Sequence, residues 1–108
     1  MEVLTRTNGR EMTLAISGDL DHHGAHGAMQ QIDHALDAAL PLSLTMDLSG
    51  VSFMDSSGIG LILGRQRCAR VLGTTLRLQH APAQLQKVLR LAGIPCMENT
   101  EKEKENAQ

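Results

Sequence analysis

The sequence predicts an α/β domain with the element order β-β-α-β-α-β-α-β. Short apolar segments rich in β-forming residues alternate with longer segments whose apolar residues recur every three or four positions. The chain has 108 residues, a length that fits one domain with a single core. Strands that alternate with helices favour a mostly parallel sheet with right-handed crossovers.

The first two strands are predicted on either side of Asn8 and Gly9, because an Asn-Gly pair is the strongest short signal for a β-hairpin. Residues 1–7 carry β-forming side chains, and residues 12–16 alternate apolar with small or polar side chains. We therefore expect an antiparallel hairpin at the start of the chain.

The first helix is predicted over residues 22–40, with Asp21 or a neighbour as its N-cap and Pro41 as its end. Its apolar residues at helical spacing are Ala25, Met29, Ile32, Leu36 and Leu40. The strand predicted over residues 42–48 is apolar on both faces, apart from Ser43, Thr45 and Asp47. That composition fits a central strand covered on both sides, or a parallel strand.

A second helix is predicted from about residue 57 to residue 72, and Gly73 is expected to end it. One broad side carries Leu61, Ile62, Cys68, Ala69 and Leu72. Ile59 and Leu63 point elsewhere, beside Arg67 and Arg70. They indicate either a surface for a partner or a helix packed on more than one side.

The remaining predicted elements are a strand over residues 74–79, a helix that begins at Pro82 and ends at Gly93, and a short edge strand over residues 94–97. The apolar stripe of this helix is Leu85, Val88, Leu89 and Ala92. We expect a domain over residues 1–98 and a polar, solvated tail over residues 99–108.

Composition excludes several classes of function. The formal net charge is −2, which gives no reason to expect nucleic acid or an anionic membrane as a partner. Apolar runs are too short to span a bilayer. The two cysteines, Cys68 and Cys96, form no CxxC pair, which favours a reduced cytoplasmic compartment. One Phe with no Trp or Tyr argues against a base-stacking surface.

Residues 55–58, Asp-Ser-Ser-Gly, fall where a strand is predicted to turn into a helix. A short polar side chain there can cap the helix, and negative charge is tolerated near a helix N-terminus. Ser56 and Ser57 are therefore either simple caps or sites of covalent modification such as phosphorylation. Asp19 and Asp21 follow another predicted strand, so both segments are expected at one edge of the sheet.

Three other motifs favour no enzyme or cofactor. The glycines at positions 58, 60 and 64 resemble a dinucleotide loop, but the domain is short and no acid follows the next strand. His22 and His26 share a predicted helix face, yet spacing supplies no third metal ligand. A serine hydrolase would need Gly-x-Ser-x-Gly, which is absent around Ser56. We expect no cofactor and no metal.

Two stretches resemble a known family. Residues 17–23, Ser-Gly-Asp-Leu-Asp-His-His, and residues 48–65 around Phe-Met-Asp-Ser-Ser-Gly are similar to STAS-domain anti-sigma factor antagonists, most closely to those of sporulation. The resemblance covers nearly the whole chain, from about Glu2 to Met97. It implies a STAS fold, with a four- to five-stranded mixed sheet and helices packed mainly on one side. The family often ends in a helix with apolar anchors, which residues 100–108 lack.

The resemblance also implies a switch protein. The unphosphorylated antagonist would bind an anti-sigma factor that is also a serine kinase, the sigma factor would be released, and phosphorylation of Ser56 would end binding until a serine phosphatase resets it. The expected partner contacts are Asp21, Asp55, Ser57, Gly58, Ile59 and Leu63. The alternative is an unphosphorylated STAS module that acts as a scaffold in a signalling or transport assembly.

Overall fold

The structure is a computed structural model, and it describes residues 1–94. The elements are β1 (Glu2–Asn8), β2 (Glu11–Leu20), α1 (His22–Ala39), β3 (Ser43–Met54), α2 (Ser56–Leu72), β4 (Thr75–Gln79) and α3 (Ala83–Leu91). This order confirms the predicted one as far as α3. The strand predicted over residues 94–97, apart from its first residue, and the tail predicted over residues 99–108 lie outside the described residues.

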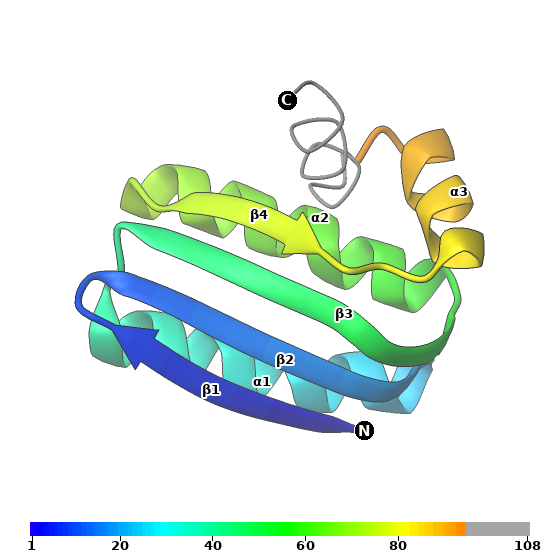
Figure 1. The fold of residues 1–108 in the computed structure, drawn as a ribbon, viewed down its shortest axis with the longest axis horizontal. Helices are drawn as coiled ribbons and strands as arrows, with labels where there is room; N and C mark the ends of the chain where they lie inside the picture. The colour runs from blue at the N-terminus through cyan, green and yellow to red at the C-terminus, as the bar shows by residue number, and fades with distance from the viewer. Residues whose placement is uncertain (95–108) are drawn as a thin grey trace, which may run out of the picture.

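The four strands form one mixed sheet in the order β1-β2-β3-β4. β1 pairs antiparallel with β2, whereas β2 with β3 and β3 with β4 are parallel. Each parallel crossover moves to the next strand in the same direction. Because such crossovers are right-handed, α1 and α2 lie on the same face of the sheet, which Figure 1 shows behind the strands. The predicted one-sided helix packing is confirmed.

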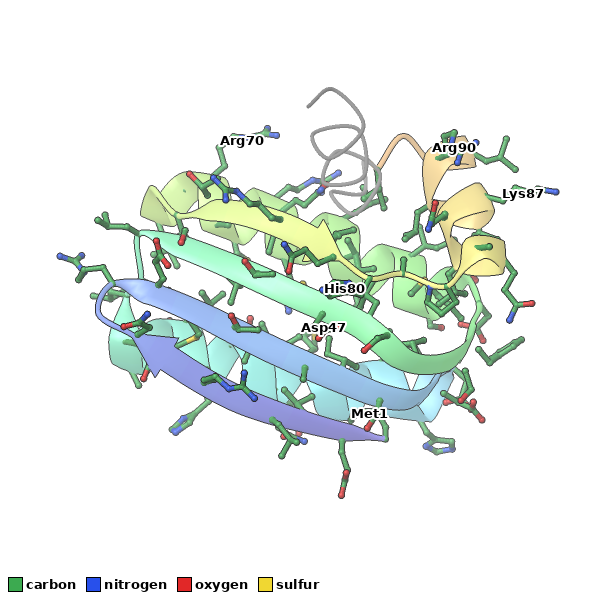
Figure 2. All side chains as sticks on the ribbon, viewed as in Figure 1. Met1, Asp47, Arg70, His80, Lys87 and Arg90 are labelled. Carbon is green, nitrogen blue, oxygen red and sulfur yellow. The ribbon has the colours of Figure 1, made fainter. Side chains whose placement is uncertain are left out.

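The core lies between the sheet and the pair formed by α1 and α2. Alternate residues of the strands face the helices and are buried, among them Leu14, Ile16, Leu44, Met46, Leu48 and Leu78. The neighbouring positions point to the other face, where Figure 2 shows Asp47 in the middle of the uncovered sheet. Among residues 1–94, β3 is therefore a parallel strand covered on one face, which contradicts the alternative of a strand covered on both faces.

Three local predictions are corrected. The two-residue turn of the hairpin consists of Gly9, at a φ of 65°, and Arg10 rather than Asn8 and Gly9, because Asn8 still pairs with Glu11. Leu40 is 52% exposed because it is the left-handed C-cap of α1, past the buried stripe. Leu72, in the last turn of α2, is 45% exposed.

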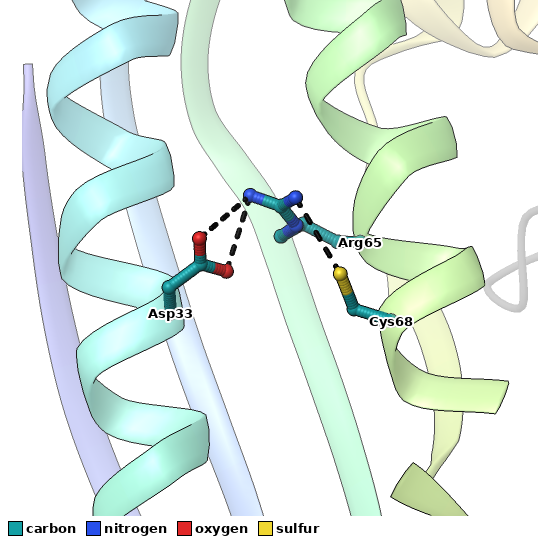
Figure 3. A network of polar contacts seen from close by, with 3 residues as sticks. All are labelled: Asp33, Arg65 and Cys68. Carbon is teal, nitrogen blue, oxygen red and sulfur yellow. Dashed lines mark hydrogen bonds and ion pairs between the residues drawn. The ribbon is translucent and has the colours of Figure 1, made fainter. Parts of the chain in front are cut away.

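One ion pair that the sequence patterns did not predict joins the two helices. Arg65 of α2 lies buried with Nη1 at 3.1 Å from Asp33 Oδ1 of α1 (Figure 3). Its Nη2 donates to Cys68 Sγ at 3.6 Å. Its Nε is buried and has no hydrogen-bond partner within the described residues. The guanidinium therefore depends on Asp33 for compensation of its charge.

No helix in the described part of the chain is long and apolar enough to cross a membrane.

We expect Asp33→Ala to lower the free energy of unfolding by about 1–3 kcal/mol, because it leaves a buried guanidinium without its carboxylate. The lower half of that range fits best, since the Asp33 side chain is 44% exposed. Arg65→Met removes the charge together with its need for a partner, so it should cost less. Urea unfolding measures both. A larger loss in Arg65→Met would show that packing, rather than charge compensation, is the main role of Arg65.

Candidate functional site

Two turns from strand to helix meet at one edge of the sheet, here called the rim and formed by residues 19–24 and 53–60. The last residue of β2, Leu20, pairs with the last residue of β3, Met54. The Asp55 N–H also donates to the Leu20 carbonyl oxygen at 3.4 Å. Asp21 and Asp55 each follow one of these paired residues, so the predicted meeting of the two acidic segments at one edge is confirmed.

Each aspartate of the rim caps the helix that follows it. Asp21 Oδ1 accepts from the Gly24 N–H at 2.9 Å, and Asp55 Oδ1 accepts from the Ser57 N–H at 2.8 Å. Both aspartates have extended backbones, as an N-cap requires. Asp21 was predicted as a cap and is confirmed. The interpretation of Ser56 and Ser57 as the caps is wrong, because the carboxylate one residue earlier occupies that role.

Ser56 is the first residue of α2, and it is exposed. Within the described residues its hydroxyl makes no hydrogen bond, because Asp55 has already taken the capping role. Ser57 is half-buried and lines a cleft of about 230 Å³ between α1 and α2, together with His22 and His26. Of the two serines, Ser56 is therefore the one that a large reactant can reach without a change in the fold.

Gly58 allows α2 to begin directly against the strands. It is buried, and a Cβ at this position would lie 2.6 Å from Met54 Cγ and 2.8 Å from the Leu20 carbonyl oxygen. Only a residue without a side chain permits this approach. Gly60, half a turn further on, has nothing within 4 Å of an added Cβ. A contact between Gly58 and a partner stays a prediction.

Three apolar side chains lie on the rim or beside it, and two of them were predicted from the sequence. Leu63 is 37% exposed, whereas Ile59 is half-buried and packs against the core. Phe53 was not predicted, and it is 49% exposed at the end of β3. The β2–β3 register shifts twice; between the two shifts Val51 turns to the core, and after the second shift Phe53 lies again on the face that Asp47 shares. A bulge of this kind redirects side chains near functional sites, and the sequence carries only a weak signal for it.

The histidines at the start of α1 do not form a metal centre in the part of the chain that the structure describes. There, no three His, Cys, Asp or Glu side chains gather as a bound metal ion would require. His22 and His23 contact each other edge to face, with ring centroids 5.9 Å apart. The geometry of the rim therefore consists of two capped helix starts, one exposed hydroxyl and a few exposed apolar side chains.

Comparison with known proteins places this geometry in a family. The family model described as "Mlab, STAS domain" matches residues 3–96. The anti-sigma F factor antagonist of Lysinibacillus sphaericus is 35% identical over 95 residues, which cover 87% of this chain and 78% of that protein. The protein of the same name from Paenibacillus polymyxa is 29% identical over 83 residues, 77% of this chain and 71% of its own. The chain belongs to the STAS-domain family.

Solved structures agree in fold. The unphosphorylated form of the anti-sigma factor antagonist SpoIIAA aligns with a TM-score of 0.78 at 27% identity, covering 98% of this chain and 95% of that one. The phosphorylated form of the Bacillus protein SpoIIAA aligns with a TM-score of 0.73 at 26% identity, covering 98% of both chains. The resemblance predicted from the two sequence stretches is confirmed, as is the STAS fold.

We expect Gly58→Ala to destabilise the domain by about 1–3 kcal/mol, the usual cost of overpacking a well-filled site. Gly60→Ala is the matched control, because it adds the same methyl group two residues away in open space. It should stabilise α2 by up to about 1 kcal/mol through its higher helix propensity. Thermal or urea unfolding of both variants measures the difference. Equal effects would contradict the close docking of α2 on Leu20 and Met54.

Asp55→Ala should lower the free energy of unfolding by about 1 kcal/mol, because the Ser57 N–H loses its acceptor. Asp55→Asn keeps an acceptor oxygen at the same place and should stay within about half of that loss. Urea unfolding distinguishes the two. If both variants were equally unstable, the charge of Asp55 rather than its hydrogen bond would stabilise the helix.

Proposed function

We propose that this chain is an anti-sigma factor antagonist whose binding is switched by phosphate on Ser56. The observation that carries the proposal is the exposed Ser56 hydroxyl at the first position of α2, which remains free because Asp55 caps the helix. The names of the curated relatives support the antagonist class. The likeness to SpoIIAA, whose structure has been solved with and without phosphate, supports the switch.

The chemistry needs no catalytic group in this chain. The proposed partner is an anti-sigma factor that is also a serine kinase. It transfers the γ-phosphoryl group of ATP to Ser56 Oγ, the hydroxyl proton is lost, and ADP leaves. A serine phosphatase later hydrolyses the phosphate ester and restores the hydroxyl. The chain thus acts in the cytoplasm as a binding protein and substrate, without a cofactor, nucleic acid or membrane.

Phosphate at Ser56 is expected to act on binding rather than on folding. It adds about −1.5 to −2 charges at pH 7, next to Asp55 and at the positive end of α2. The helix end offsets part of the repulsion by roughly 0.3–1 kcal/mol, so the domain stays folded. In a contact with a partner the same charge must be desolvated at a cost of several kcal/mol. Each 1.4 kcal/mol of unfavourable free energy weakens the affinity about tenfold. A cost of several kcal/mol therefore ends binding.

The proposed contact surface contains two kinds of side chain. Asp21 and Asp55 each use Oδ1 for capping, and the charge that remains would attract basic groups of the partner. Leu63 and Phe53 supply exposed apolar area, and Ile59 supplies a smaller share. Ser57 and Gly58 hold the turn in shape beneath this surface.

Intact-mass analysis tests the modification site. After incubation with the host's anti-sigma kinase and ATP, the wild-type chain should gain one phosphate and Ser56→Ala should gain none. Ser57→Ala is the matched control and should be modified like the wild type. A phosphate on Ser56→Ala would move the site elsewhere. No phosphate on any form, with the kinase still bound, would support the alternative of an unphosphorylated scaffold.

Calorimetric titration with the same kinase tests the switch separately. Ser56→Asp should bind at least tenfold more weakly than the wild type, while Ser56→Ala should bind with similar affinity. The magnitude follows from a charge forced into a contact from which water is excluded. Unchanged affinity of Ser56→Asp would contradict blockade by charge even if Ser56 is phosphorylated.

A further inference from the structure

The outer edge of β1 is the longest regular sheet edge that the described residues leave open. β1 pairs with β2 only and lies at the border of the sheet (Figure 1). Its residues Glu2–Asn8 pair with β2 in seven successive positions without a register shift, whereas the β2–β3 pairing has two shifts. β1 also contains no proline or lysine. Of the usual devices that prevent an edge strand from pairing, β1 has only charged side chains, those of Glu2 and Arg6.

Hairpin geometry determines which backbone groups face outward. The loop between β1 and β2 has two residues, so its flanking residues Asn8 and Glu11 form a hydrogen-bonded pair. Hydrogen-bonded and non-hydrogen-bonded pairs then alternate along the strand. Every second residue of β1, counting back from Asn8, bonds to β2. Val3, Thr5 and Thr7 consequently direct their N–H and C=O groups away from the sheet.

The two charged residues of β1 lie at equal distances on either side of Leu4 and have opposite signs. Glu2, Leu4 and Arg6 point to the uncovered face, and Leu4 is 67% exposed. Glu2 and Arg6 carry opposite charges two positions on either side of Leu4, and neither forms an ion pair with another described residue. In an antiparallel pair of two such strands centred on Leu4, each glutamate lies opposite an arginine.

We propose that β1 pairs antiparallel with β1 of a second copy of this chain, about a two-fold axis at Leu4. Val3 and Thr5 of each strand then exchange hydrogen bonds with Thr5 and Val3 of the other, which uses the outward groups. Leu4 meets Leu4 of the second copy in a non-hydrogen-bonded pair, where side chains lie closest. Glu2 meets Arg6 twice. The product is one continuous sheet with four strands from each copy.

A second copy fits this edge better than an open-ended assembly does. The two-fold pairing is isologous and closes after two chains. The other edge strand, β4, does not share the pattern, since the same symmetric pairing about its middle residue would set Arg77 against Arg77. Like charges directly opposite each other destabilise a strand pair.

α1 does not oppose the pairing electrostatically, because its side next to β1 is uncharged near the middle. Gly27 of α1 lies beside Met1, with the Met1 Cε atom 3.3 Å from the position of an added Cβ. Gln30 and Gln31, three and four residues further along, share that side and are exposed. No like charges therefore oppose each other where these described parts of two α1 helices would flank the axis.

The interface is small, and we expect a weak dimer. A strip of seven residues per chain buries less than the roughly 1,600 Å² that is typical of stable complexes. We therefore expect a dissociation constant of the dimer between about 10 µM and about 1 mM. The two rims point in opposite directions in the dimer, because the two-fold axis reverses the strand direction. Binding at Ser56 and pairing at β1 are thus separate properties.

Sedimentation velocity on the untagged chain, over a wide range of concentration, tests the proposal. The wild type should shift from monomer to dimer as concentration rises. Glu2→Arg sets two arginines against each other at both ends of the pairing and should weaken the dimer at least tenfold. Combining it with Arg6→Glu exchanges the two charges and should restore the wild-type affinity. Arg77→Glu, a charge reversal on the same face of the other edge strand, is the matched control and should leave the dimer unchanged.

Thr5→Pro supplies a second test, because it removes an outward N–H while the bonds to β2 remain. It should stay folded by circular dichroism and sediment as a monomer.

A wild type that remains monomeric at the highest concentration would overturn the proposal. So would a folded Thr5→Pro that dimerises like the wild type. Failure of the double charge exchange to restore affinity would overturn the pairing about Leu4. Ser56→Ala should dimerise normally, so this result does not depend on the proposed switch.

Discussion

The parallel pairing of β2 with β3 is the constraint on which the rest of the domain depends. It brings Leu20 next to Met54, so that both following helices begin at one edge of the sheet. Right-handed crossovers then place α1 and α2 on one face, and the ion pair between buried Arg65 and partly exposed Asp33 joins the two helices. The rim, the one-sided core and the uncovered sheet face all follow from this single arrangement.

The chemistry of the rim depends on a division of roles between neighbouring residues. If Ser56 capped α2 with its own hydroxyl, any modification would remove a hydrogen bond worth about 1 kcal/mol and disturb the helix. Because Asp55 accepts from the Ser57 N–H instead, the Ser56 hydroxyl makes no hydrogen bond with another residue of the described part of the chain. A phosphate at this position can then change what the surface binds while the fold that presents it remains intact. That separation favours the proposed switch in binding over one that works by local unfolding.

Sequence patterns predicted the elements well, because each depends on local periodicity and on caps. Asp21 as a cap, Gly73 as the end of α2 and the shared edge of the acidic segments could all be deduced from spacing and topology. The sequence patterns failed where contacts between residues far apart in the sequence determine whether a side chain is buried. The burial of Arg65 depends on Asp33 in another helix, and the burial of Val51 depends on a shift in the pairing of β3 with β2. Periodicity along one segment carries no information about either.

A sheet with helices on one face also leaves two edges and a bare face, and the domain treats the edges differently. β4 is short and has Arg77 at its centre, so it is poorly suited to symmetric pairing. β1 is longer, regular and balanced in charge about Leu4. Since its N-terminal end adjoins the rim while its outer side faces away from both helix starts, pairing there would present two rims without covering either. Because the two-fold axis turns the two rims in opposite directions, each rim would bind its partner on its own, and no gain in affinity from simultaneous engagement of both rims is expected.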